Sequence, residues 1–198
     1  MILVRSKVIC PPKKMFLEGD SITENTTGEP SWVLHTSNSF VNNATSGDTL
    51  VQIAAQIDAG LAANFPGCDV IIVIGGVNDI GDAVASGSDP VVGMIAAIDY
   101  IVQQSVATGV PVLISTITPY GNTSLATAQG IAWGAAYNNY VLTNTWPALV
   151  TVFDINALLD ADSDGTMDAA YATGDYIHPN QAGDIAIASE IDNMLADC

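Results

Sequence analysis

The chain reads DVIIVIGGVND at residues 69–79. Its five consecutive apolar residues, Val70 to Ile74, are too few to cross a bilayer and are the right length for a buried strand. The run Val110 to Ile114 has the same character. Strands that are apolar throughout are typical of parallel sheets with helices on both faces. These runs therefore predict an α/β fold.

Strand-like runs of this kind alternate with longer helical patterns along the whole chain. The expected strands are Lys14–Glu18, Ser39–Asn43, Asp69–Ile74, Val110–Thr116 and Val150–Asp154. The expected helices are rich in alanine, carry apolar residues three and four positions apart, and span Thr49–Asn64, Pro90–Thr108, Ser124–Thr145 and Gln181–Leu195. This alternation predicts a three-layer α/β/α sandwich around a central five-stranded parallel sheet.

The length of 198 residues, with 49% hydrophobic residues, fits one domain. We expect it to span residues 15–198, with residues 1–14 as an N-terminal extension, because Pro11 and Pro12 shorten the first strand. The longest apolar runs are too short to cross a bilayer, so we expect a soluble protein. The extension lacks the continuous apolar stretch of a signal peptide, and we leave the localisation, including secretion, open. The three cysteines match no zinc motif and cannot form a complete disulfide framework; they are Cys10, Cys68 and Cys198.

The formal net charge is -17, and every basic residue lies at or before Lys14; these residues are Arg5, Lys7, Lys13 and Lys14. The rest of the chain is therefore a polyanion. Such a surface repels nucleic acid and anionic membranes, because binding to both depends on Lys and Arg facing phosphates. The composition excludes a nucleic-acid-binding protein and favours neutral or cationic small-molecule partners.

Four polar motifs are expected at the carboxyl edge of the parallel sheet, where open sheets of this kind bind ligands. Three follow expected strands and one precedes the last expected helix: Gly19-Asp20-Ser21-Ile22-Thr23, Ser46-Gly47-Asp48, Gly76-Val77-Asn78-Asp79 and Asp175-Tyr176-Ile177-His178-Pro179-Asn180. Each motif alone has a structural explanation, as a helix cap, a turn or a satisfied polar residue. Together they supply a nucleophile, a base, an orienting carboxylate and an oxyanion donor, and so predict an acyl-transfer site.

The four motifs, in this order, resemble the sequence blocks of the SGNH hydrolases, also called the GDSL esterase/lipase family. The resemblance extends from Met15 to Leu195 and implies the flavodoxin-like, doubly wound SGNH hydrolase fold. It implies that Ser21 is the nucleophile, His178 the general base and then acid, and Asp175 the group that orients the imidazole. It also implies an oxyanion hole made by the backbone N–H groups of Ser21 and Gly47 and the side-chain amide of Asn78. Catalysis by these groups requires no cofactor.

The resemblance implies a carboxylic ester hydrolase. We expect small neutral esters with short acyl chains, including O-acetyl groups on carbohydrate, because no inserted lid is visible between the motifs and an anionic body disfavours anionic lipid surfaces. Two alternatives stay open: a thioesterase or lysophospholipase of the same family, and a non-catalytic sugar-binding module on the same scaffold. The sequence gives no indication of oligomeric state.

A separate acidic segment, residues 160–168, has carboxylates at positions one, three, five and nine of an EF-hand-like loop; they are Asp160, Asp162, Asp164 and Asp168. Gly165 stands at position six, but Tyr171 replaces the bidentate glutamate at position twelve. A structural calcium ion and a merely solvated acidic loop both remain open. The other histidine, His35, lies beside Trp32 in a helix-like stretch, where a structural role is expected.

Overall fold

The computed structural model describes residues 12–24 and 31–196; residues 1–11, most of the expected N-terminal extension, lie outside the described residues, as do Cys10 and Cys198. Five strands form one parallel sheet in the order β2-β1-β3-β4-β5. They are β1 (Lys14–Gly19), β2 (Ser39–Asn42), β3 (Val70–Ile74), β4 (Val112–Ser115) and β5 (Val150–Phe153). This is the flavodoxin-like doubly wound order, so the expected fold is confirmed.

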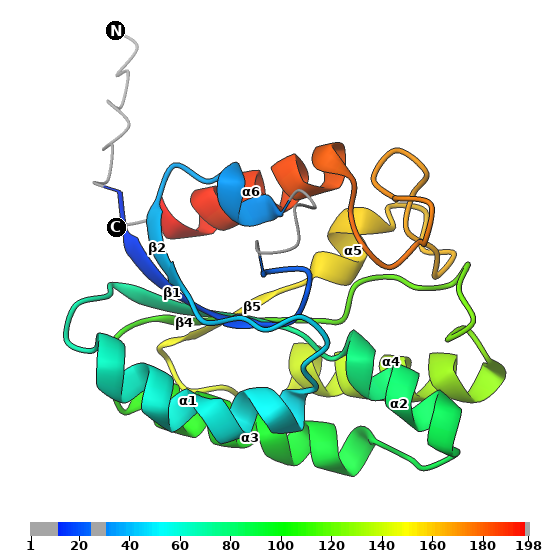
Figure 1. Ribbon diagram of the computed structural model, residues 1–198, viewed down its shortest axis with the longest axis horizontal. Coiled ribbons are helices and arrows are strands. Elements are labelled where there is room, and N and C mark those ends of the chain that lie inside the picture. The colour runs from blue at the N-terminus through cyan, green and yellow to red at the C-terminus, as the bar shows by residue number, and fades with distance from the viewer. Residues whose placement is uncertain (1–11, 25–30, 197–198) are drawn as a thin grey trace, which may run out of the picture.

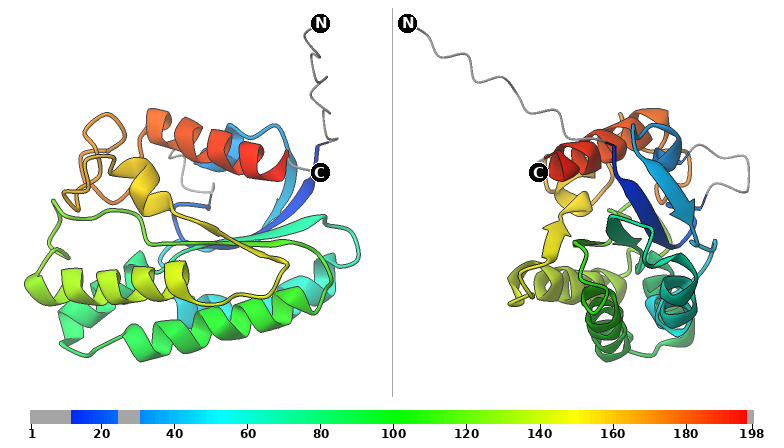
Figure 2. Two further views of the ribbon diagram at one scale, coloured as in Figure 1. Left: turned by 180° about the vertical axis from the view of Figure 1, so that it is seen from behind. Right: turned by 90° about the vertical axis from the view of Figure 1, so that its left-hand side faces the viewer.

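Helices cover both faces of the sheet, which completes the three expected layers (Figures 1 and 2). One face carries α1 (Leu50–Asn64), α2 (Val77–Ser86), α3 (Val91–Val106) and α4 (Ala128–Thr143). The other carries the 3₁₀ helix η1 (Trp32–Leu34), α5 (Ile155–Leu159) and α6 (Gln181–Leu195). Within the described ranges, no helix is long and apolar enough to cross a membrane.

The central strands are buried on both faces, as in other parallel sheets whose crossover helices cover both sides. All five residues of β3 are buried, and β1 is buried from Met15 onward. Burial of an aliphatic side chain stabilises the fold by about 1.5–3 kcal/mol. Side-chain caps mark the start of several helices; at α1, Thr49 and Gln52 form a capping box.

The expected strands and long helices are present, with ends shifted by a few residues. Two helices were not expected: α2 and α5. Trp32 lies in η1 and His35 forms its C-cap, so the helix-like stretch around them is a single 3₁₀ turn. Cys68 is a buried free thiol.

Candidate active site

Ser21 lies in a tight turn at the carboxyl end of β1. The N–H of Glu24 closes this turn by donating to the Asp20 carbonyl at 2.9 Å, and the Asp20 N–H donates to the Ile74 carbonyl of β3 at 3.3 Å. Gly19 precedes the turn because a Cβ there would lie 2.3 Å from the Ile74 carbonyl oxygen. We call residues 20–24 the nucleophile turn, after the role expected for Ser21. Its backbone contacts hold half-buried Ser21 at the carboxyl edge of the sheet.

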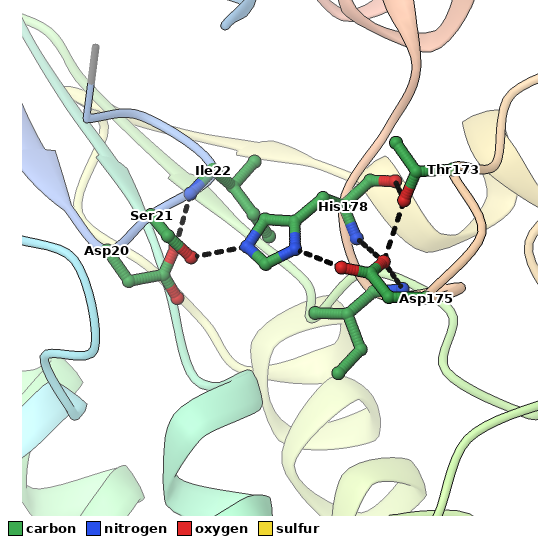
Figure 3. Close-up of polar contacts among 7 residues, drawn as sticks. Asp20, Ser21, Ile22, Thr173, Asp175 and His178 are labelled. Carbon is green, nitrogen blue, oxygen red and sulfur yellow. Dashed lines mark hydrogen bonds and ion pairs between the residues drawn. The ribbon is translucent and has the colours of Figure 1, made fainter. Parts of the chain in front are cut away.

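A continuous chain of hydrogen bonds joins this turn to the loop before α6 (Figure 3). The Ser21 Oγ lies 2.8 Å from the His178 Nε2, and the His178 Nδ1 lies 2.7 Å from the Asp175 Oδ2. Because Asp175 accepts at Nδ1, the network assigns the ring proton to Nδ1 and leaves Nε2 to accept from the serine hydroxyl. The structure therefore brings Ser21 together with Asp175 and with His178, which lies 157 residues after it in the sequence.

Asp175 is held as an anion by several donors. Its Oδ1 accepts from the N–H groups of Ile177 at 2.8 Å and His178 at 3.0 Å, and the Thr173 Oγ1 lies 2.7 Å away. Partial burial raises the pKa of Asp175, but the hydrogen bonds from His178, Ile177 and Thr173 outweigh it and hold the pKa well below its usual range. Asp175 therefore orients the imidazole without competing for its proton.

The loop that carries His178, residues 173–180, is braced at both ends; we call it the catalytic loop. The Thr173 N–H donates to the His178 carbonyl at 3.1 Å, and Asn180 caps α6 by accepting from Ala182 at 2.8 Å. Tyr176 has φ 57°, a left-handed conformation that few non-glycine residues adopt. That turn allows the Asp175 carboxylate to face the imidazole three residues later.

The segment after β2 lies against the nucleophile turn. The Thr45 N–H donates to the Gly19 carbonyl at 3.0 Å, and the Ser46 N–H donates to the Glu24 Oε2 at 3.0 Å. Gly47 follows in the left-handed region, with φ 85°. In the described part of the chain, the N–H groups of Ser21 and Gly47 have no hydrogen-bond partner. Both groups are therefore free to donate to a substrate oxygen.

Asn78 lies in the first turn of α2 and is half-buried. Its Nδ2 donates to the Asp48 carbonyl at 3.0 Å, which fixes the amide and leaves its second N–H available. The neighbouring Asp79 accepts from the Leu50 N–H at 2.9 Å and so ties α2 to α1. The structure thus places the donors expected at Ser21, Gly47 and Asn78 on one connected edge.

Several buried acids surround this edge, and the sequence motifs assign no role to them. Burial raises the pKa of Glu18 to about 7 and that of Asp184, in the first turn of α6, to about 7. Asn43 donates to Glu18 at 2.8 Å, which partly offsets the cost of burying that carboxyl. Glu18 is a charged residue near the end of an otherwise apolar strand, and this is the sequence signal that points to these buried acids.

The acidic loop, residues 160–168, brings three of the four expected calcium ligands together. Asp160, Asp162 and Asp168 each place one carboxylate oxygen within 4.8 Å of the others. Asp164 is outside this group, and its Oδ1 accepts from the Thr166 N–H at 2.8 Å. The nearby Asp164 charge raises the pKa of Asp162. Oxygen-rich donors suit Ca²⁺, so calcium stays a prediction for this loop.

A family model described as GDSL-like Lipase/Acylhydrolase family matches residues 18–184. A search of curated proteins found no match.

Solved structures with the same architecture include a GDSL-like lipase from Bacteroides thetaiotaomicron, with a TM-score of 0.71 and 17% identity over 92% of this chain and 87% of that one. An acetyl xylan esterase, AlAXEase, has a TM-score of 0.70 and 15% identity over 92% and 99% of the two chains. A variant of an acetyl xylan esterase from Geobacillus stearothermophilus has a TM-score of 0.67 and 18% identity over 91% and 93%. At these identities the likeness shows the fold.

Proposed function

The chain belongs to the GDSL-like lipase and acylhydrolase family, and from this membership we propose that it is a serine ester hydrolase that forms an acyl-enzyme on Ser21. The observation that carries the proposal is the unbroken chain from the Ser21 Oγ through the imidazole of His178 to the Asp175 carboxylate, with links of 2.8 and 2.7 Å. A serine hydroxyl needs a neutral, oriented imidazole to become a nucleophile at neutral pH.

In the acylation step, the Ser21 Oγ attacks the ester carbonyl carbon while the His178 Nε2 takes the hydroxyl proton. The tetrahedral intermediate then collapses, the bond from carbon to the alcohol oxygen breaks, and the imidazolium returns the proton to the departing alcohol. Asp175 stays ionised throughout and stabilises the positive ring.

In the deacylation step, His178 takes a proton from water as the water oxygen attacks the acyl carbon. The bond to the Ser21 Oγ breaks, and the proton passes from Nε2 to that oxygen. The free acid leaves and the resting serine is restored.

The oxyanion of each intermediate is bound by the N–H groups of Ser21 and Gly47 and by the free amide hydrogen of Asn78. This assignment is supported by the two unpartnered N–H groups and by the Asp48 carbonyl that holds the amide in place. One such donor is worth about 10²–10³-fold in kcat.

The substrates that we propose are small neutral esters with acyl groups from acetyl to about butyryl, including O-acetyl groups on carbohydrate. The site is open, with 40% of the His178 side chain and 51% of the Asp175 side chain exposed, so a long acyl chain would gain little burial there. Each methylene left in water forgoes about 0.8 kcal/mol. Two of the structural neighbours, described as acetyl xylan esterases, are consistent with an acetylated sugar as substrate.

The nucleophile is tested with a fluorophosphonate probe and the substitution Ser21→Ala. We expect the probe to label Ser21, located by peptide mass spectrometry, and the variant to lose labelling and about 10⁶-fold in kcat. Ser88→Ala, which changes an exposed serine after α2, is the matched control and should retain full activity. A native chain that is neither labelled nor active would instead indicate a non-catalytic sugar-binding module.

The substrate class is tested by kcat/KM for acetyl, butyryl, octanoyl and palmitoyl esters of one alcohol, with acetate release from acetylated xylan measured alongside. We expect the maximum at acetyl or butyryl. A maximum at octanoyl or longer would contradict the proposed substrate and favour a lysophospholipase. Faster turnover of short acyl thioesters than of the matched oxygen esters would favour a thioesterase.

A further inference from the structure

The Asp20 carboxyl, next to the nucleophile in sequence, is fully buried, with 0% of the residue exposed. Its Oδ1 accepts from the Ile22 N–H at 3.0 Å, so the side chain spans Ser21 (Figure 3). Its Oδ2 has no partner among the residues that the structure describes. One oxygen is therefore committed to the nucleophile turn, and the other is not satisfied by protein.

The space beside this carboxyl is also too small to hold a water molecule. It is lined by Gly75 after β3 and by Thr116 and Thr118 after β4. A Cβ at Gly75 would lie 3.7 Å from the Oδ2, which places that oxygen at the end of β3. The Thr118 Oγ1 is also buried without a partner in the described chain. A negative charge in this position is poorly solvated, which favours a bound proton.

Charged groups face this carboxyl from two sides. Burial raises the pKa of Asp20 to about 7; the Ile22 N–H and a positive His178 oppose the rise, and Asp79 of α2 adds to it. His178 is itself faced by Asp175 at Nδ1 and by the buried Asp184 of α6. Of these charged residues, Asp20 is the one that also accepts a hydrogen bond within the nucleophile turn, from the Ile22 N–H.

We propose that Asp20 is a positioning residue of the catalytic pair: its Oδ1 fixes the nucleophile turn through Ile22, and the ionisation of its shielded carboxyl is coupled to that of His178. The proposal rests on the proposed function, since it concerns the same serine and histidine.

The coupling is reciprocal. A positive imidazole favours loss of the Asp20 proton, and an ionised Asp20 favours the imidazolium that forms when His178 takes the proton of Ser21. Above about pH 7, Asp20 supports that imidazolium with a negative charge, and as the pH falls below about 7, it takes up a proton and the support is lost.

The test uses two substitutions that separate the hydrogen bond from the charge. Asp20→Asn keeps an oxygen that accepts from the Ile22 N–H but cannot ionise, whereas Asp20→Ala removes both. The readout is the NMR titration of the His178 ring, which is simple to assign because the chain has 2 histidines. In the asparagine variant we expect His178 to titrate lower by roughly half a pH unit or more, as a single ionisation.

The matched control is Asp58→Asn, which removes one carboxylate that accepts from Tyr100 on the outer helices and should leave the His178 titration unchanged. Superimposable titrations of the native protein and the Asp20→Asn variant would overturn the coupling. We also expect kcat of the alanine variant to be about 10²-fold below that of the asparagine variant, because the nucleophile shifts. Equal rates would overturn the positioning role; Asp20→Val, which also lacks an acceptor, serves the same comparison if the alanine variant does not fold.

The titration requires no turnover, so the two proposals can fail separately. Absence of labelling at Ser21 would refute the serine hydrolase without changing the titration result. An unchanged titration in a labelled, active enzyme would refute the coupling alone.

Discussion

Two aspartate-bearing loops follow one another between α5 and α6, and their carboxylates have opposite environments. In the catalytic loop, burial of Asp175 is outweighed by hydrogen bonds that lower its pKa. In the acidic loop, the neighbouring charge of Asp164 raises the pKa of Asp162. The residue type is the same, so the donors around each carboxylate decide whether its charge is stabilised.

The donors of the acidic loop come from its own backbone. Asp160 accepts from the N–H groups of Asp164 at 3.1 Å and Gly165 at 2.8 Å, while the gathered oxygens of Asp162 and Asp168 remain close to it. The catalytic loop has a histidine opposite its aspartate, and the acidic loop has no Lys or Arg, because every such residue lies at or before Lys14. A bound cation would balance the carboxylates of the acidic loop, as the imidazole of His178 pairs with Asp175 in the catalytic loop.

The largest expected effect removes the carboxylate charge from the catalytic loop. Asp175→Asn should lower kcat by about 10⁴-fold, because an amide no longer fixes the imidazole tautomer or stabilises the imidazolium. The change is measured by steady-state kinetics on a short-chain ester. Asp162→Asn, the same substitution in the acidic loop, should leave kcat unchanged, and similar losses in both variants would show that the two loops do not differ as described.

A smaller effect is expected from calcium at the acidic loop. If Asp160, Asp162 and Asp168 bind Ca²⁺, a hundredfold excess over the Kd should stabilise the fold by about 2.7 kcal/mol, seen as a higher Tm than in EDTA. The Asp162→Asn variant should lose most of this response. Identical Tm values of the native protein with calcium and with EDTA would show that the loop does not bind calcium.

Acid should weaken the calcium response. The pKa of Asp162 is raised, so this ligand takes up its proton at a higher pH than an ordinary aspartate, and a protonated carboxyl is a poorer ligand. The difference in Tm between calcium and EDTA should therefore shrink as the pH is lowered toward the carboxyl range. The pKa of Asp175 is shifted the other way, so it remains ionised over the same interval.

The smallest expected effect removes one donor from the catalytic loop. Thr173 places its Oγ1 2.7 Å from the Asp175 Oδ1 and 2.9 Å from the His178 carbonyl. Thr173→Val should lower kcat by roughly tenfold, as expected for loss of one hydrogen bond of about 1.4 kcal/mol to a charged group. Thr173→Ser should restore the rate; a serine variant as slow as the valine variant would show that the methyl group, and not the hydroxyl, matters.

The sheet and the long helices are predictable from the sequence because buried strands are apolar throughout and the helices repeat at three and four residues. α2 is not predictable in this way. Its first turn carries the polar pair Asn78 and Asp79, and Gly76 precedes the helix with φ 116°, so the local pattern resembles a loop. Its helical start depends on the contact that Asp79 makes with the Leu50 N–H, which is a tertiary contact.

The residues of the candidate site are predictable as motifs, but their supports are not. The Asp48 carbonyl that accepts from the Asn78 amide is a backbone group. Every residue type has such a carbonyl, so the sequence gives no signal for this contact. Thr173 lies outside the expected motif, and its role depends on the path of the loop. The burial of Asp20 depends on residues that follow β3 and β4, far away in sequence.

The two partners of the catalytic pair are attached to different parts of the molecule. Ser21 follows β1, an inner strand of the sheet, whereas His178 is fixed to the start of α6, which lies on the outer layer (Figure 1). Asn180 both caps α6 and donates through its Nδ2 to the carbonyls of Ala170 and Ala172 at 3.0 Å. Fraying of the first turn of α6 would therefore separate the histidine from the serine while the sheet is intact. On heating, we therefore expect activity to be lost before the sheet unfolds, because the docking of one helix keeps the histidine beside the serine.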